Sequence, residues 1–266
     1  MKLIVHTADY GMSDCITDGC LHAIRNGILN DVGLMTNNEC SQRAVDEIKK
    51  YPHVSMGQEI NLVFGNPVTD PKLIPSLVNE EGRFMTSRER MAKFPGDENM
   101  GLVWEEVYME TENQVKKYIE MVGKKPLYLG GHSITTPYIT KAREDVAAKY
   151  GINLDWKEHL NQGVRNRWYQ NFSRTKSGFT PELQATTDVE GFIIEDKGGL
   201  LGHEYSMLST HCGFFDADLM KLSTFHIIRG VECSALVSPK VKQWIKDNNI
   251  ELINVEQFFK EKGIEY

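Results

Sequence analysis

The stretch LIVHTADYGMS, residues 3–13, opens the chain and decides its fold. Its apolar start is typical of a strand that is covered on both faces in a parallel α/β sheet. Ligands of such folds collect where the strands end, at their carboxyl edge. The polar turn after the strand therefore places Asp9 where chemistry is expected, although Asp9 or Ser13 could equally cap the helix that follows.

Strand-like and helix-like segments alternate along the rest of the chain. This rhythm is typical of βαβ units and predicts a parallel sheet. The predicted strands are 2–5, 31–34, 54–62, 126–129, 205–209 and 250–255. The predicted helices are 16–26, 40–51, 104–121, 140–150 and 239–248, with a short helix at the end.

Two stretches interrupt the alternation. Residues 65–101 are rich in Pro and Gly, which predicts a long insertion between the regular strands and helices. Residues 156–187 mix Arg with aromatic side chains, such as Arg165 and Trp168, which suits either a lid over a sugar or an ordinary surface insertion. We expect one domain, 1–266, that carries both insertions.

Composition excludes several classes of protein. The chain has 266 residues, a formal net charge of −7 and 41% hydrophobic residues. The acidic balance argues against binding nucleic acid, and the chain lacks an apolar run long enough to span a membrane. The five cysteines form no C-x-x-C pair, which favours a reducing compartment. We therefore expect a cytoplasmic protein without nucleic-acid or membrane partners; a homodimer stays open.

Polar side chains follow four of the predicted strands. Asp9, His132 and His211 each come after an apolar run, and Glu59 and Asn61 share one face of the strand 54–62 because side chains alternate along a strand. Carboxylates and imidazoles that meet at one edge suit a divalent metal ion that activates water. A single buried histidine is nevertheless often a hydrogen-bonded core residue, so the pattern leaves both interpretations open.

The motifs resemble those of the YdjC-like carbohydrate deacetylases, relatives of the chitooligosaccharide deacetylases, over nearly the whole chain. The opening motif of that family, N-A-D-D-F-G-L-S, is similar to residues 6–13 here, and G-x-H-x-N-L is similar to residues 57–62. P-x-x-x-D-S-H-x-H is similar to residues 126–134 and C-H-P-G-Y to residues 210–214. A final R-x-x-E-x-x-x-L resembles the spacing of Arg229, Glu232 and Leu236.

The resemblance implies a distorted TIM-like (β/α) barrel. It also implies that the second Asp of the opening motif and two histidines hold a divalent metal ion, with the first Asp as general base. This chain departs from that pattern at four positions of the family's catalytic motifs. Where the family has Asp, His, Asp and His, this sequence has Ala8, Glu59, Gly130 and Ile134.

From these residues we expect Asp9, Glu59 and His132 to be the metal ligands, for Zn, Mg, Mn, Ni or Co. Exchange of an imidazole for a carboxylate at Glu59 favours harder ions. His211 is the candidate general acid. Ala8 cannot serve as the base, so Glu59 or Asp14 is the candidate for that role.

Three further residues complete the candidate site. Asn61, Tyr10 and Arg229 are the candidate substrate contacts, although Asn61 could instead satisfy backbone groups at its strand end. Arg229 and Glu232 could also form an ion pair that supports the site.

We expect the protein to be a metal-dependent hydrolase that removes an acyl group from a small carbohydrate or a related amide. The acyl group that we expect is N-acetyl. Two alternatives stay open. The four departures favour a catalytically silent carbohydrate-binding or regulatory protein on the same fold. An acid–base enzyme that works without metal, through His211 and a carboxylate, is the other.

Overall fold

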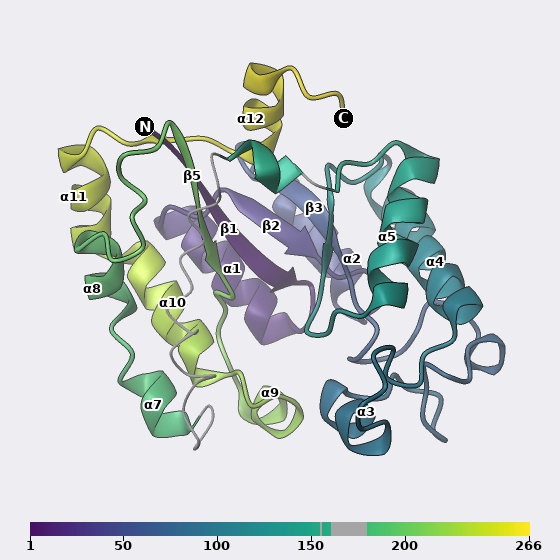
Figure 1. Cartoon of the computed structure of the whole chain (residues 1–266). Helices are drawn as coiled ribbons and strands as arrows, with labels where there is room; N and C mark the ends of the chain where they lie inside the picture. The colour runs from purple at the N-terminus through teal and green to yellow at the C-terminus, as the bar shows by residue number, and fades with distance from the viewer. Residues whose placement is uncertain (155, 161–179) are drawn as a thin grey trace.

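The computed structural model describes residues 1–154, 156–160 and 180–266. Six parallel strands form one sheet in the order β4-β3-β2-β1-β5, and β6 pairs with the start of β1 (Figure 1). The strands are β1 (Lys2–Tyr10), β2 (Asp31–Leu34), β3 (Ser55–Ile60), β4 (Leu129–Gly131), β5 (Tyr205–Thr210) and β6 (Glu251–Leu252). The predicted α/β class with a parallel sheet is confirmed. Within the described ranges no ladder joins β4 to β5.

Helices connect the strands and cover the sheet. In chain order the helical segments are α1 (Asp14–Asn26), α2 (Ser41–Ile48), η1 (Pro71–Leu73), α3 (Ser87–Lys93), α4 (Trp104–Val122), α5 (Pro137–Tyr150), η2 (Trp156–His159), α7 (Pro181–Ala185), α8 (Val189–Ile194), α9 (Ala217–Leu222), α10 (Ile227–Val237), α11 (Pro239–Asp247) and α12 (Val255–Lys262). No helix of the described residues is long and apolar enough to cross a membrane.

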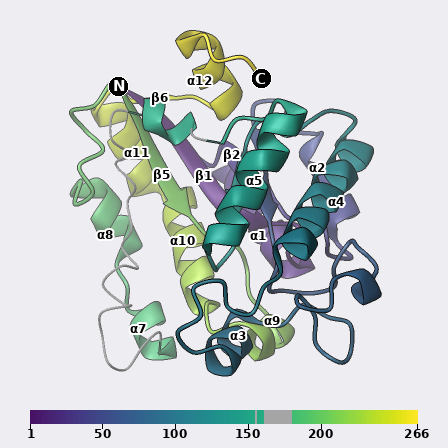
Figure 2. The ribbon, with the colours of Figure 1, turned by 45° about the vertical axis from the view of Figure 1, so that its right-hand side comes forward.

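The two ends of the sheet are covered differently. In Figures 1 and 2, α12 lies near the N-terminus, at the end where β1 begins, whereas α3 and α9 lie at the opposite end, beyond the arrowhead of β1. Helices α1 and α10 contact each other on one flank, and α4 and α5 pack together on the other. The carboxyl ends of the strands are therefore surrounded by short helices and loops rather than by long covering helices.

The central strand β1 is buried on both faces. Leu3 and Val5 belong to the core against α1 and α10, while Ile4 packs with Tyr128 and Phe258 in a separate core. A strand with two covered faces needs a continuous apolar run, which is why residues 3–5 show no alternation.

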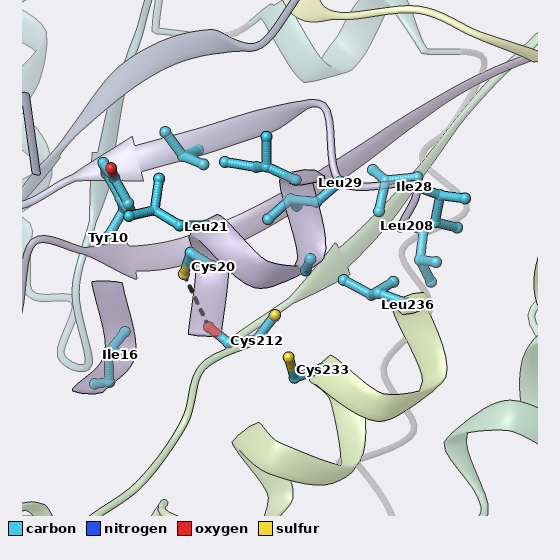
Figure 3. Close-up of a cluster of buried hydrophobic side chains, with 14 of the residues drawn as sticks. Tyr10, Ile16, Cys20, Leu21, Ile28, Leu29, Leu208, Cys212, Cys233 and Leu236 are labelled. Atoms are coloured by element: carbon cyan, nitrogen blue, oxygen red, sulfur yellow. Dashed lines mark hydrogen bonds between the residues drawn. The ribbon is translucent and has the colours of Figure 1, made fainter. Parts of the chain in front are cut away.

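The core between α1 and α10 contains three buried cysteines, Cys20, Cys212 and Cys233 (Figure 3). The thiol of Cys20 donates to the carbonyl of Cys212, and the thiol of Cys233 to the carbonyl of Gly19. All five cysteines lie in the described residues and are free thiols. The three buried ones act as small core residues, because burial is typical of unpaired cysteine.

The structure describes the first predicted insertion, but only part of the second. The first, 65–101, contains η1, α3 and a bridge between Val78 and Phe84, so it is more ordered than its composition indicates. Most of the second, including Arg165 and Trp168, lies outside the described residues.

Candidate active site

Asp9 lies at the end of β1. Its backbone conformation there breaks the regular alternation of side chains between the two faces of the strand. The register between β1 and β2 shifts between Thr7 and Tyr10, and Asp9 has φ 66°. Asp is among the few residues that tolerate this left-handed region, and irregular pairing of this kind often re-aims a side chain beside an active site. The side chain is 1% exposed. The end of the first strand thus buries a carboxylate that needs partners.

Those partners come from distant parts of the chain. One oxygen, Oδ1, lies 2.8 Å from Nδ1 of His132, and the other, Oδ2, accepts a hydrogen bond from Nη2 of Arg229 at 2.6 Å. Burial alone would raise the pKa of Asp9, but the charges of His132 and Arg229 outweigh it and hold that pKa well below its usual range. Asp9 is therefore an anion.

Glu59 lies at the end of β3, next to Asp9. Its Oε2 accepts the backbone N–H of Asp9 at 3.1 Å. Its Cα partner on β4 is Gly130, and Gly33 on β2 lies on its other side. Burial and the charge of Asp9 raise the pKa of Glu59 well above its usual range. Burial and the anionic Asp9 thus oppose the ionisation of Glu59 while no cation is bound.

His132 follows β4 directly. Its N–H donates to the carbonyl of Ile60, which fixes the end of β4 against the end of β3. Asp9, Glu59 and His132 each offer one ligand atom, and these atoms lie within 4.8 Å of one another. Carboxylates and imidazole are donors that divalent cations accept. A cation would also offset the repulsion between the two carboxylates, so these three residues fit a metal ion.

His211 follows β5. Two side chains of α10 form hydrogen bonds with its backbone, one with the N–H and one with the carbonyl. Its N–H donates to Oε2 of Glu232 at 2.6 Å, and its carbonyl accepts from Nη1 of Arg229 at 3.4 Å. The imidazole packs edge-on against Phe225, with ring centroids 4.9 Å apart. Burial lowers the pKa of His211 to about 4, so the ring is neutral at neutral pH.

A cavity of about 610 Å³ opens at this end of the sheet. Asp9, His132, His211 and Arg229 line it together. Hydroxyl side chains on its wall are Thr86, Ser87, Ser133, Ser223 and Thr224; apolar ones are Met12, Val63, Phe64, Met220, Leu222 and Phe225; cationic ones are Arg88 and Lys221. Sequence reasoning missed the wall that α3 and α9 supply. The only available signal was the length of the excursion 65–101, since loops that long are often functional.

Four predicted site residues are not part of the cavity wall: Glu59, which lies next to Asp9, and Tyr10, Asn61 and Asp14. Tyr10 is fully buried in the core, where its hydroxyl donates to the carbonyl of Ala44. Asn61 is also fully buried, and its amide oxygen accepts the N–H groups of Val63 and Phe64. The local geometry thus gives both residues structural partners, which favours the backbone-satisfying alternative for Asn61.

Asp14 is exposed at the start of α1 and forms an ion pair with Arg43 at 2.7 Å. It does not belong to the residues that line the main cavity. The ion pair with Arg43 and the place of Asp14 outside this cavity do not favour its predicted role as general base.

The fold and the cluster define a class: an α/β protein whose candidate active site lies at the carboxyl ends of parallel strands. The chain belongs to the YdjC-like protein family, whose model matches residues 2–247. A relative named Carbohydrate deacetylase 2, from Listeria innocua serovar 6a, is 30% identical over 260 residues, which are 96% of this chain and 97% of that protein. The predicted family, with its enzymes named as deacetylases, is thus confirmed.

Solved structures show the same fold. A crystal structure of an Enterococcus faecalis V583 protein, provisionally named a cellobiose-phosphate cleavage protein, aligns with a TM-score of 0.71 at 20% identity, covering 97% of this chain and 98% of that one. A family 4 acetyl xylan esterase from Clostridium thermocellum, in complex with a cobalt ion, aligns with a TM-score of 0.53 at 10% identity, covering 100% and 93%.

Proposed function

We propose that this protein is a metal-dependent carbohydrate deacetylase, which hydrolyses the amide of an N-acetylated small saccharide and releases acetate. One observation carries the proposal: the cluster of Asp9, Glu59 and His132 lies beside His211, and three of these four residues line one cavity. The name of the Listeria innocua relative supports the same reaction.

In this proposal Asp9, Glu59 and His132 hold a divalent cation. When bound, such an ion would supply Lewis-acid polarisation of the acyl carbonyl and would make the attacking water more acidic. Arg229 keeps Asp9 ionised and fixes the direction of its carboxylate through the bond to Oδ2. The N–H of Asp9 fixes Glu59 in the same way. The chain thus positions all its donors before a substrate arrives, as catalysis by charge stabilisation requires.

His211 is the proposed acid–base residue. Ala8 offers no carboxylate, and Asp14 lies away from the cavity, whereas His211 lines it. A neutral imidazole can first accept the proton of the attacking water and then, as imidazolium, donate it to the leaving amine. The role expected from the sequence, general acid alone, thereby becomes the second half of a two-step role.

The cavity wall fits a saccharide. Its hydroxyl side chains can exchange hydrogen bonds with sugar hydroxyls, and its apolar side chains can pack on the C–H face of a sugar ring. A volume of about 610 Å³ is in the range of small-ligand sites. A mono- or disaccharide is therefore the substrate size that we propose.

The test is acetate release from N-acetylated mono- and disaccharides, with added divalent metal and with a chelator. We expect Asp9→Asn and His132→Ala to lower kcat/KM by about 100-fold or more, because each removes a charge or donor used in the transition state. Asp14→Asn is the matched control, since it removes an exposed carboxylate from the same strand-to-helix turn, and should stay within about threefold. Activity in Asp9→Asn equal to that of the unaltered protein would contradict the proposal.

The second candidate is a silent saccharide-binding protein, which Ala8 favours because the family places a carboxylate there. It predicts that saccharides raise the thermal unfolding midpoint without any acetate release. Hydrolysis that survives complete chelation would instead point to the metal-free acid–base enzyme.

A further inference from the structure

We propose that Glu59 sets the metal selectivity of this site, by shifting it away from Zn²⁺ and toward oxygen-preferring cations such as Mn²⁺. The inference rests on the proposed metal site of Asp9, Glu59 and His132. It adds which ion that site favours and which residue is responsible.

The carboxylate of Glu59 occupies a space that the neighbouring strands leave for it. A Cβ atom at Gly33 would lie 2.7 Å from Cγ of Glu59, which is too close for any real contact. A Cβ atom at Gly130 would lie 3.4 Å from Cγ and 3.5 Å from Oε1, which is ordinary contact. The absence of a side chain at Gly33 is therefore a condition for the observed position of Glu59. The two glycines thus leave room between the strands for a long side chain at position 59.

The hydrogen bonds leave Glu59 able to bind a cation. Oε2 accepts the N–H of Asp9, and a carboxylate offers about four lone-pair positions, which is more than this one bond uses. Oδ2 of Asp9 is held by Arg229, so Oδ1, which faces His132, is the oxygen that Asp9 turns toward the cluster. The donors that converge are thus two carboxylate oxygens and one imidazole nitrogen.

This donor set has a distinct preference. Carboxylate oxygen suits Mg²⁺ and Mn²⁺, whereas each additional imidazole favours Zn²⁺, Cu²⁺ and Ni²⁺. Charge does not separate the two ions, because Zn²⁺ and Mn²⁺ both carry two positive charges, so the preference rests on the donor atoms. The general order of affinities still makes Zn²⁺ bind more tightly than Mn²⁺ at most protein sites. The inference therefore concerns the ratio of the two affinities and how Glu59 changes it.

The experiment compares Mn²⁺ and Zn²⁺ binding to the full chain without substrate. Mn²⁺ is followed by the loss of the free-ion signal in electron paramagnetic resonance, and Zn²⁺ by competition with a coloured chelator. The variants are Glu59→His, which replaces the carboxylate with imidazole, and Glu59→Gln, which keeps the shape and removes the charge. Asp14→Asn is the control, because Asp14 is exposed and outside the cluster.

We expect Glu59→His to raise the preference for Zn²⁺ over Mn²⁺ by about tenfold or more. Glu59→Gln should weaken both ions by about tenfold or more, and Asp14→Asn should change neither. A preference in Glu59→His that stays within threefold of the unaltered protein would overturn the inference, as would unaltered Mn²⁺ affinity in Glu59→Gln. Far-ultraviolet circular dichroism checks that each variant is folded, and the glutamine variant provides the answer should the histidine variant fail to fold.

Failure of this inference is distinguishable from failure of the proposed function. Metal affinities are measured without any saccharide, so a shifted preference without acetate release would support the inference and contradict the deacetylase. Acetate release with an unshifted preference would do the reverse.

Discussion

Asp9 takes part in three separate contacts from one position. Its N–H holds Glu59, one oxygen faces His132, and the other oxygen is bonded to Arg229. Only the last two depend on the charge of the side chain. Asp9→Asn should therefore leave the backbone contact to Glu59 intact while it removes the charge that pairs with Arg229, which makes it a sharper variant than a truncation.

Gly33 offers a test of how tightly Glu59 is fitted. We expect Gly33→Ala to displace the Glu59 carboxylate, because the new Cβ would lie 2.7 Å from its Cγ. The change should lower Mn²⁺ affinity by about tenfold or cost about 1–3 kcal/mol of stability through overpacking. Gly130→Ala is the matched control from the other side of Glu59, since its Cβ would lie in ordinary contact at 3.4 Å. Equal metal affinity and stability in the two variants would contradict the fit.

The neutral state of His211 predicts a pH dependence of stability. Burial is the main cause of its lowered pKa of about 4, Arg229, His132 and His6 add to it, and Asp9 opposes it. The ordinary pKa is near 6.5, so the folded state favours the neutral ring. The stabilisation is complete above about pH 6.5 and is lost as the pH falls toward about 4, by up to about 3 kcal/mol.

Urea unfolding at about pH 7.5 and about pH 5, with a chelator present, measures this effect. His211→Asn should show a smaller drop in the free energy of unfolding between the two pH values than the unaltered protein. Identical drops would show that His211 does not titrate in this way.

Helix α10 links the two halves of the site. Arg229 and Glu232, one turn apart, hold the carbonyl and the N–H of His211, and Arg229 also reaches Asp9. The sequence did not predict this helix. Its residues are apolar almost all round and include several β-branched side chains, so no helical stripe stands out; such a helix is recognisable only by its burial between α1, α7 and α8.

Helix α3 depends on one buried cation. Arg90 is fully buried, and its guanidinium donates to the carbonyls of Ser76, Leu77 and Met100. We expect Arg90→Met to cost about 2–4 kcal/mol, because it leaves buried carbonyls without donors. Urea unfolding measures the loss. Lys93→Met is the control in the same helix, because Lys93 is exposed, and a similar loss in both variants would contradict the role of Arg90.

Element prediction succeeded where the pattern was local. The predicted strand 31–34 and helix 16–26 match β2 and α1 closely. An apolar run and a capped amphipathic stretch each indicate, from neighbouring residues alone, which side chains are buried. The predicted strand 2–5 was too short: β1 continues to Tyr10, since its polar end is paired with β2 and β5. A polar strand end in the middle of a sheet has no apolar signature.

At the scale of the whole molecule, the sequence predicted which residues come together in the cluster of Asp9, Glu59 and His132 better than it predicted the cavity. Asp9, Glu59 and His132 each lie at or just after the end of a recognisable strand, and parallel strands end at the same edge of a sheet. The walls from α3 and α9 depend on how loops fold back over that edge. Tyr10 and Asp14 are neighbours of Asp9 in sequence, but a shift of one residue along a strand turns a side chain to the other face, and the structure places Tyr10 in the core and Asp14 beside Arg43.

The pairing of β1 also determines the order in which the site can form. Its partners β5 and β6 lie about two hundred residues further along the chain, so the central strand is made early during synthesis and completed late. Contacts between such distant segments fold slowly, because a long loop must close before they form. Asp9, Glu59 and His132 all emerge from the ribosome before β5, His211 and Arg229. The three proposed metal ligands are therefore made before the guanidinium that fixes Asp9 and before the imidazole that is proposed to move protons.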